Sequence, residues 1–360
     1  MFQANDDREE EPAVVIHLDD HCPIGISNPK FQYQFNRRKF QKETIPFSLE
    51  TCSDQIQLLI PRPPSCILSE ILIATSTSMN IIMIIEKFDR AMFLFNLSTK
   101  KLEKQFKVKD YGVFLIEENY DGIGHDACIV TCKADVLPRH YSAIEQYQRA
   151  GLLIAKYDLH HFISEHERNL TPTPLWVSST LLLPIQLVCV QYNKDLLNKI
   201  YGVSRIGQVL VLRSSNGSIL FKETLKWHAT NKYKMSILNQ LIYGCFINDG
   251  SDLLIATRKL IGIFSCQIRD GLLQFTLKIE IAPKILSICG ICYESSTNKL
   301  FISEKASTTV QVYNTLNGQL LQSLQIPKIS ESHSGIKIIE HTGELAVLDP
   351  CEPTLLQLFK

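Results

Sequence analysis

The sequence lacks the segments that would place it in a membrane or a secretory pathway. Its longest apolar stretch, residues 181–190, is too short to span a bilayer and is interrupted by Pro184 and Gln186. The N-terminal MFQANDDREEEP contains no apolar core of a signal peptide. We therefore expect a cytoplasmic protein with no membrane contact. The basic run RRKFQK, residues 37–42, fits a nuclear import element, so nuclear localisation is an alternative. A charged edge strand that discourages aggregation explains the same run equally well.

An excess of either charge is also missing. The chain has 37 Lys and Arg against 37 Asp and Glu, so no global field would attract nucleic acid or an anionic membrane. Any electrostatic attraction of a partner must come from a local patch.

Motifs of catalysis and metal binding are scarce. There is no glycine-rich phosphate loop and no nucleophile elbow, and the 11 cysteines lie singly in apolar runs, as buried cysteines of a reducing compartment do. Cys289 and Cys292 form a lone pair on a predicted strand without the second pair that zinc requires, and Cys128 and Cys132 alternate as core residues would. We predict no enzyme, no cofactor, no metal and no small-molecule substrate.

The composition is that of an ordinary globular domain. The chain has 360 residues, 45% of them hydrophobic and 21% charged, which suffices for a sizeable core. We predict that the acidic residues 1–12 form a disordered tail and that residues 13–360 form the folded domain.

A repeat runs along the chain. Six apolar runs resemble one another: AMFLFNL (91–97), GLLIAKYDL (151–159), GQVLVLRSS (207–215), LIGIFSCQI (260–268), TTVQVYNTL (308–316) and PTLLQLFK (353–360). Aligned on one aromatic or leucine position per run, residues 95, 157, 212, 264, 313 and 359, the steps are 62, 55, 52, 49 and 46 residues. A period of this length is typical of propeller blades.

Each repeat has the pattern of four strands. In three copies the run is followed by a turn pair, at residues 216–217, 270–271 and 317–318, whose Asn-Gly or Asp-Gly chemistry favours a tight hairpin with positive φ. Two further strand-like segments precede each run, and several, such as NIIMII (80–85), are continuously apolar, as strands buried on both faces are. The sequence therefore predicts an all-β protein with a single β-propeller, in which six blades are favoured and seven are the alternative.

The last repeat ends at Lys360 with only three strands. We expect a strand from the N-terminal region, such as KFQYQF (30–35), to complete it and close the ring. The strand-like segments TIPFSL and QIQLLI, between residues 40 and 60, are the material for the seven-bladed alternative.

The C-terminal repeat resembles a known family. Residues 335–359, with Gly335, Gly343, Asp349 and the run Leu356–Phe359, resemble an NHL-like (WD40-like) β-propeller repeat, and residues 290–318 do so more loosely. Neither tryptophan precedes an Asp, so the Trp-Asp signature of WD40 repeats is absent. The resemblance implies a platform for proteins or for single-stranded RNA, although related six-bladed folds include hydrolases and lyases.

The connections between strands alternate between the two faces of a propeller. One face carries the connections between second and third strands and the connections between blades. We call it the basic face, because Lys and Arg outnumber Asp and Glu there, whereas Asp and Glu predominate on the opposite face. In KWHATNKYK, residues 226–234, the lysines alternate with aromatic side chains, a pattern that single-stranded nucleic acid binding requires. The simpler interpretation of the same segment is a charged loop exposed to solvent. The predicted binding residues are Lys133, Arg205, Lys226, Trp227, His228, Lys232, Tyr233, Lys234, Arg258 and Lys259.

Two insertions, residues 134–150 and 160–174, add to the predicted binding surface, because recognition is often placed in long loops on a rigid scaffold. The histidines of the second insertion, His160, His161 and His166, are spaced for a solvent-exposed position and not for a metal site.

We therefore predict a non-catalytic interaction platform that binds an acidic protein partner through the basic face and the insertions. One alternative is single-stranded RNA binding on the basic face. Another is a six-bladed metal-dependent hydrolase, for which Glu117, Glu118 and Asn119 stand at a suitable strand end, but without matching residues in the other repeats.

Overall fold

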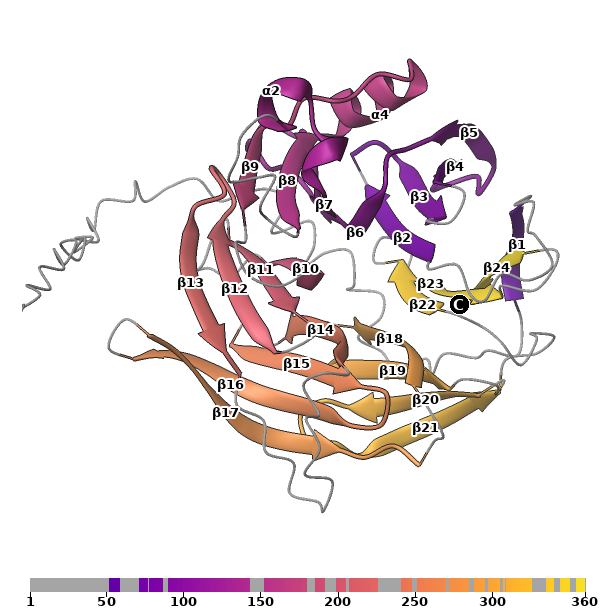
Figure 1. Ribbon diagram of the computed structural model, residues 1–360. Helices are drawn as coiled ribbons and strands as arrows, with labels where there is room; N and C mark the ends of the chain where they lie inside the picture. Colours follow the sequence, from indigo (N-terminus) through magenta and orange to yellow (C-terminus); the bar gives the residue numbers. More distant parts are fainter. Residues whose placement is uncertain are drawn as a thin grey trace, which may run out of the picture.

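The strands that the structure describes form six four-stranded antiparallel sheets, which stand around a common centre in the computed structural model (Figure 1). The structure describes residues 52–58, 71–76, 78–86, 90–142, 152–179, 185–191, 199–204, 207–225, 241–247, 251–269, 272–284, 288–294, 297–304, 307, 309–325, 335–339, 344–349 and 354–359. The prediction of an all-β single propeller is confirmed. The predicted disordered tail, residues 1–12, lies outside the described residues.

Five sheets are continuous in sequence, with the first strand of each nearest the centre (Figure 1). Their strands are β2 (Ile71–Ser76), β3 (Ile81–Glu86), β4 (Ala91–Asn96) and β5 (Leu102–Lys107); β6 (Tyr111–Glu117), β7 (Ala127–Cys132), β8 (Leu153–Asp158) and β9 (Trp176–Ser179); β10 (Ile185–Gln191), β11 (Lys199–Ser204), β12 (Gln208–Arg213) and β13 (Ile219–Thr224); β14 (Leu241–Ile247), β15 (Asp252–Thr257), β16 (Ile261–Arg269) and β17 (Leu272–Ile281); and β18 (Ile288–Glu294), β19 (Lys299–Glu304), β20 (Thr309–Asn314) and β21 (Leu320–Gln325).

The sixth sheet joins the two ends of the chain. It contains β22 (Gly335–Ile339), β23 (Glu344–Asp349), β24 (Thr354–Phe359) and, paired antiparallel to β24, β1 (Cys52–Leu58). A strand from the N-terminal region closes the ring as expected, but it is 52–58, whereas 30–35 lies outside the described residues. This strand takes up most of the segment QIQLLI that the seven-bladed alternative required.

All six repeated runs occupy the same place in their sheets. They supply β4, β8, β12, β16, β20 and β24, each the third strand from the centre. The period was readable because an apolar third strand is buried in every blade, whatever the length of the loops between blades.

Continuous apolar strands pack against two neighbouring blades at once. In β3, Met83 faces the cluster shared with the second blade, while Ile82 faces the cluster that contains Ala346 of the last blade. In β15, Leu253 and Leu254 likewise belong to the clusters on opposite sides. Burying each such side chain contributes about 1.5–3 kcal/mol, so the contacts between blades hold the ring together.

The outer hairpins differ in detail from the predicted tight turn. Gly217 and Gly318 have positive φ values of 72° and 74°, whereas Asn216 and Asn317 are not among the described residues with positive φ. The chain reverses over four residues, Gly217 N donates to Arg213 O at 2.8 Å, and the strand register shifts beside each turn. One residue with positive φ, followed by a β-bulge, thus makes the turn for which two such residues were predicted. The third pair, residues 270–271, lies outside the described residues.

Helices occur only in the second blade among the described residues. A 3₁₀ helix, η1 (Ala134–Val136), and α2 (Arg139–Ser142) follow β7, and α4 (Leu159–Glu167) follows β8 (Figure 1). None of the described helices is long and apolar enough to cross a membrane.

Candidate functional site

Three of the predicted binding residues lie within the described chain, and all three are exposed. Lys133 follows β7 directly, and Arg258 and Lys259 follow β15. These positions are connections between second and third strands, so they belong to the same face of the propeller. The remaining seven lie outside the described residues: Arg205, Lys226, Trp227, His228, Lys232, Tyr233 and Lys234.

The two insertions lie at opposite ends of β8. The first, 134–150, of which the structure describes residues as far as 142, precedes β8 and is on the side of Lys133. The second, 160–174, follows β8 and is therefore on the opposite face. A partner bound flat on one face can contact only one of them.

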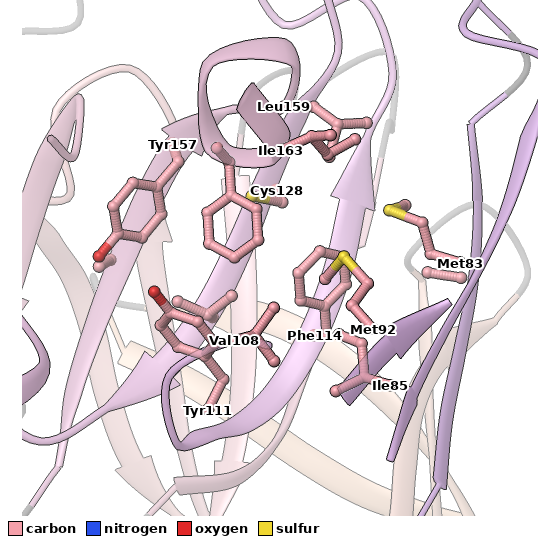
Figure 2. Packing of buried hydrophobic residues seen from close by; sticks show 14 of the residues in the cluster. Met83, Ile85, Met92, Val108, Tyr111, Phe114, Cys128, Tyr157, Leu159 and Ile163 are labelled. Carbon is pink, nitrogen blue, oxygen red and sulfur yellow. The ribbon is translucent and has the colours of Figure 1, made fainter. Parts of the chain in front are cut away.

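The second insertion is anchored in the core. Asp158 caps α4, since its carboxylate accepts from His161 N at 2.8 Å. Leu159 and Ile163 of the helix point into the cluster that also contains Tyr111 and Phe114, as Figure 2 shows. The helix is thus a rigid part of the propeller, in contrast to a loop that could be removed without loss of stability.

The prediction that the histidines of this insertion are exposed is wrong for His166. Its side chain is buried between Phe162, Phe106 and Tyr111, whereas His160 and His161 are exposed. His166 Nδ1 lies 2.8 Å from the carbonyl of Phe162, which can only accept, so Nδ1 carries the proton and Nε2 faces the Tyr111 hydroxyl at 3.3 Å. The four-residue step from Phe162 to His166 on an amphipathic helix was the signal for this burial.

A cavity of about 340 Å³ opens at the joint between the second and third blades. Three connections from two blades form it: the β6–β7 loop, the segment before β9 and the β12–β13 turn. Its lining residues are Tyr120, Asp121, Lys156, Leu175, Trp176, Ser214 and Ser215. Its size is at the lower end of the range of ligand pockets.

Lys156 of the lining belongs to a buried ion pair. Lys156 Nζ lies 2.7 Å from Glu117 Oε2 and donates to the hydroxyl and carbonyl oxygens of Ser214 at 2.8 and 3.2 Å. The Ser214 hydroxyl donates to Glu117 at 2.7 Å. All three hydrogens of the ammonium therefore have acceptors, and the network ties the second blade to the third.

Trp176 forms a wall of the cavity and is fixed by the third blade. Its indole Nε1 donates to the carbonyl of Ser214 at 2.7 Å. Its ring packs so closely on Gly217 that a Cβ added there would lie 2.5 Å from Cε3 of the indole. The glycine of the hairpin is thus required twice, by its positive φ and by this contact.

Carboxylates predominate around the cavity. Burial would raise the pKa of Asp121, but its hydrogen bonds outweigh this effect and lower the pKa. They come from the backbone N–H groups of Ile123 and His125 and from the His125 ring, whose Nδ1 lies 2.5 Å from Asp121 Oδ2. Burial and the neighbouring Asp158, to which the Tyr120 hydroxyl donates at 3.3 Å, raise the pKa of Tyr120 to about 12. Asp121 is ionised and Tyr120 neutral at physiological pH.

The sequence reasoning missed this cavity and gave Glu117 a different role. Glu117 was considered for a central metal cage, but it is fully buried against Lys156 at the joint between blades. Among the described residues, no group of three or more His, Cys, Asp or Glu is arranged to hold a metal ion. Cys128 and Cys132 are buried in the core, as predicted. The available signal for the network was Lys156 itself, a lone cation in the apolar run GLLIAKYDL.

Comparisons with known proteins support the fold alone. No family model matches the sequence, and no curated protein matches it. The β-propeller domain of Cps50 (Swd1) from Myceliophteria thermophila has a similar structure, with a TM-score of 0.53 and 9% identity, over 87% of this chain and 99% of that one.

Two further solved structures are more distant. The C-terminal WD40 domain of Sif2 has a TM-score of 0.45 and 12% identity, over 80% of this chain and 69% of that chain. The computationally designed Ika8 protein has a TM-score of 0.42 and 11% identity, over 81% of this chain and 71% of that one. The β-propeller fold of this chain is therefore similar to that of the Cps50 (Swd1) domain, while the NHL-like subtype stays a prediction.

Proposed function

We propose that this propeller is a non-catalytic interaction platform that binds an acidic protein partner through its basic face. It acts without a cofactor, in the cytoplasm or the nucleus. The observation that carries the proposal is the exposure of Lys133, Arg258 and Lys259 on connections that belong to one face. Arg258 and Lys259 lie on a short connection between β15 and β16, whose backbone needs little ordering when a partner binds, and Lys133 follows β7 directly at the start of the first insertion.

The first insertion supports the same face. Its exposed Arg139 in α2 follows Lys133 by six residues on the same connection between β7 and β8, which also carries the exposed Asp135. A partner with an acidic surface would meet these charges together, which would speed its association and make its binding dependent on salt.

The test is a comparison of two charge-reversal variants. The first replaces three cations of the basic face, Lys133→Glu, Arg258→Glu and Lys259→Glu. The control makes the same change in net charge on exposed residues of the opposite face, with Lys101→Glu, Arg213→Glu and Arg269→Glu. We expect partners recovered from cell extract by the unmodified chain to be lost with the first variant and kept with the control. Equal recovery by both variants would refute the proposal.

Single-stranded RNA is an outcome of the same test. A random RNA pool is titrated against the unmodified chain and both variants at two salt concentrations. Binding that weakens steeply with salt and is lost in the first variant would assign the basic face to nucleic acid in place of an acidic protein.

A further inference from the structure

We propose that the cavity at the joint of the second and third blades binds an arginine side chain from a basic segment of a partner protein. This site lies on the face opposite to Lys133 and requires a partner of the opposite charge. It is therefore independent of the function proposed for the basic face.

The charge around the cavity favours a cation. Glu117, Asp121 and Asp158 contribute three carboxylates, of which Asp121 lines the cavity directly, and Lys156 contributes the single ammonium. That ammonium is neutralised by Glu117 and has acceptors for all its hydrogens, so it offers nothing to an anion. An anionic ligand would face the carboxylate of Asp121 in the lining, with Asp158 hydrogen-bonded to the lining residue Tyr120.

Asp121 can accept a further hydrogen bond. One oxygen accepts from the backbone N–H groups of Ile123 and His125, at 3.0 and 3.2 Å, and the other faces His125 Nδ1 at 2.5 Å. A carboxylate has about four acceptor positions, so one remains for a ligand. The three existing contacts hold the group in place before any ligand arrives.

The walls suit a planar, weakly hydrated cation. Trp176 and Tyr120 line the cavity with aromatic rings, and Leu175, 47% exposed, adds an aliphatic surface. The Lys156 ammonium already lies 4.8 Å from the centroid of the Tyr120 ring, so Trp176 is the aromatic ring that a ligand cation would meet. A guanidinium group stacks on aromatic faces and pairs with carboxylates, and its aliphatic stem packs on apolar side chains, which together favour arginine over lysine.

Two exposed apolar side chains follow or precede lining residues closely in the sequence, and they suit an arginine that is part of a longer segment. Ile123, 80% exposed, is two residues from Asp121, and Leu170, 51% exposed, belongs to the second insertion. Apolar residues next to the arginine of the partner would cover them. We therefore use as probe the peptide acetyl-Gly-Leu-Arg-Leu-Gly-amide, with a citrulline peptide of the same shape but without charge as its control.

The experiment uses the full chain labelled with 5-fluorotryptophan. The chain has two tryptophans, so ¹⁹F NMR gives one signal from the cavity, Trp176, and one from the basic segment, Trp227, assigned with Trp227→Phe. We expect the arginine peptide to shift the Trp176 signal with a Kd of about 1 mM, as one anchored side chain allows. The citrulline peptide should bind about tenfold more weakly, because it lacks the charge.

Matched variants locate the binding. Ser215→Phe fills the cavity from its edge, whereas Ser218→Phe places the same ring on a nearby exposed position outside the lining. Asp121→Asn removes the negative charge of the lining, and Asp110→Asn removes an exposed negative charge elsewhere. Ser215→Phe and Asp121→Asn should each weaken binding about tenfold, and the two controls should leave it unchanged.

The proposal is overturned if the Trp176 signal does not move at about 10 mM peptide, if citrulline binds equally well, or if Ser215→Phe has no effect. A polyglutamate peptide added to the same sample tests the basic face separately. A shift of Trp227 alone by polyglutamate, with no response of Trp176 to arginine, would leave the proposed function standing and refute this inference.

Discussion

Replacing Lys156 by methionine should destabilise the protein more than most single substitutions. Lys156 is 2% exposed and its partner Glu117 is fully buried, so the substitution leaves a buried carboxylate. Among the described residues, the hydroxyl of Ser214 is then its remaining side-chain partner. Methionine keeps most of the aliphatic volume, which limits the effect of a cavity. Breaking a buried pair in this way costs about 3–5 kcal/mol of the free energy of unfolding.

The chain offers a control pair at the surface. Arg168 lies 3.5 Å from Glu165, but its side chain is 68% exposed. Solvent screens such a pair, so Arg168→Met should change the free energy of unfolding by about 0.5 kcal/mol or less. The two variants each remove one positive charge, and only burial distinguishes them.

Urea unfolding followed by circular dichroism measures both effects. The double variant Lys156→Met/Glu117→Gln should recover part of the loss, because no buried charge remains, and its cost should be lower than the sum of the single costs by about 1.5 kcal/mol or more. The reasoning is refuted if Lys156→Met costs less than about 1 kcal/mol, or if the single costs add in the double variant.

Three further outcomes are expected. Gly217→Ala should lower the free energy of unfolding by more than about 2 kcal/mol, because the new methyl group meets the indole ring of Trp176. Gly122→Ala is the control in the same urea assay: Gly122 has a φ of 81° and open space around it, so only the backbone cost of about 1 kcal/mol is expected. Burial lowers the pKa of His166, so as the pH falls the unfolded chain takes up a proton at this residue before the folded chain does, and the stability that the neutral His166 contributes above about pH 6.5 is lost below it. His166→Phe should therefore make the urea midpoint depend less on pH between roughly 7 and 5, and an unchanged dependence would contradict the burial of a neutral His166. Removing residues 1–59 deletes β1 from the last blade, so it should lower the melting temperature and promote association through the exposed edge of β24. Removing residues 1–50 keeps β1 and should have neither effect. Equal melting temperatures of the two truncated chains would contradict closure of the ring by β1.

The two proposals require partners of opposite charge. Lys133 and Arg258 would attract acidic partners, while Asp121 on the opposite face would attract a basic segment. A neutral net charge is compatible with both, because the charges that matter to a partner lie within about 10 Å of it at physiological salt.

The predicted strands agree with the structure where the pattern is local. NIIMII and the six third strands were found because apolar side chains recur at fixed distances along one segment. The closing strand was misplaced because β1 pairs with β24 about 300 residues away, and a short strand pattern does not say which edge it completes. The exposure of His166 was wrong because the helix of the second insertion packs on the core instead of projecting into solvent.

The sequence by itself determined the repeat, the third strand of every blade and the all-β propeller, because these depend on apolar periodicity within segments of six to ten residues. Only the tertiary structure decided what Lys156, Glu117 and Ser214 do. Glu117 and Ser214 are 97 residues apart in the chain and meet only where the second blade packs on the third. The physical reason is that a charge buried between blades must find its partner in the neighbouring blade, and the pattern within one repeat carries no information about that neighbour.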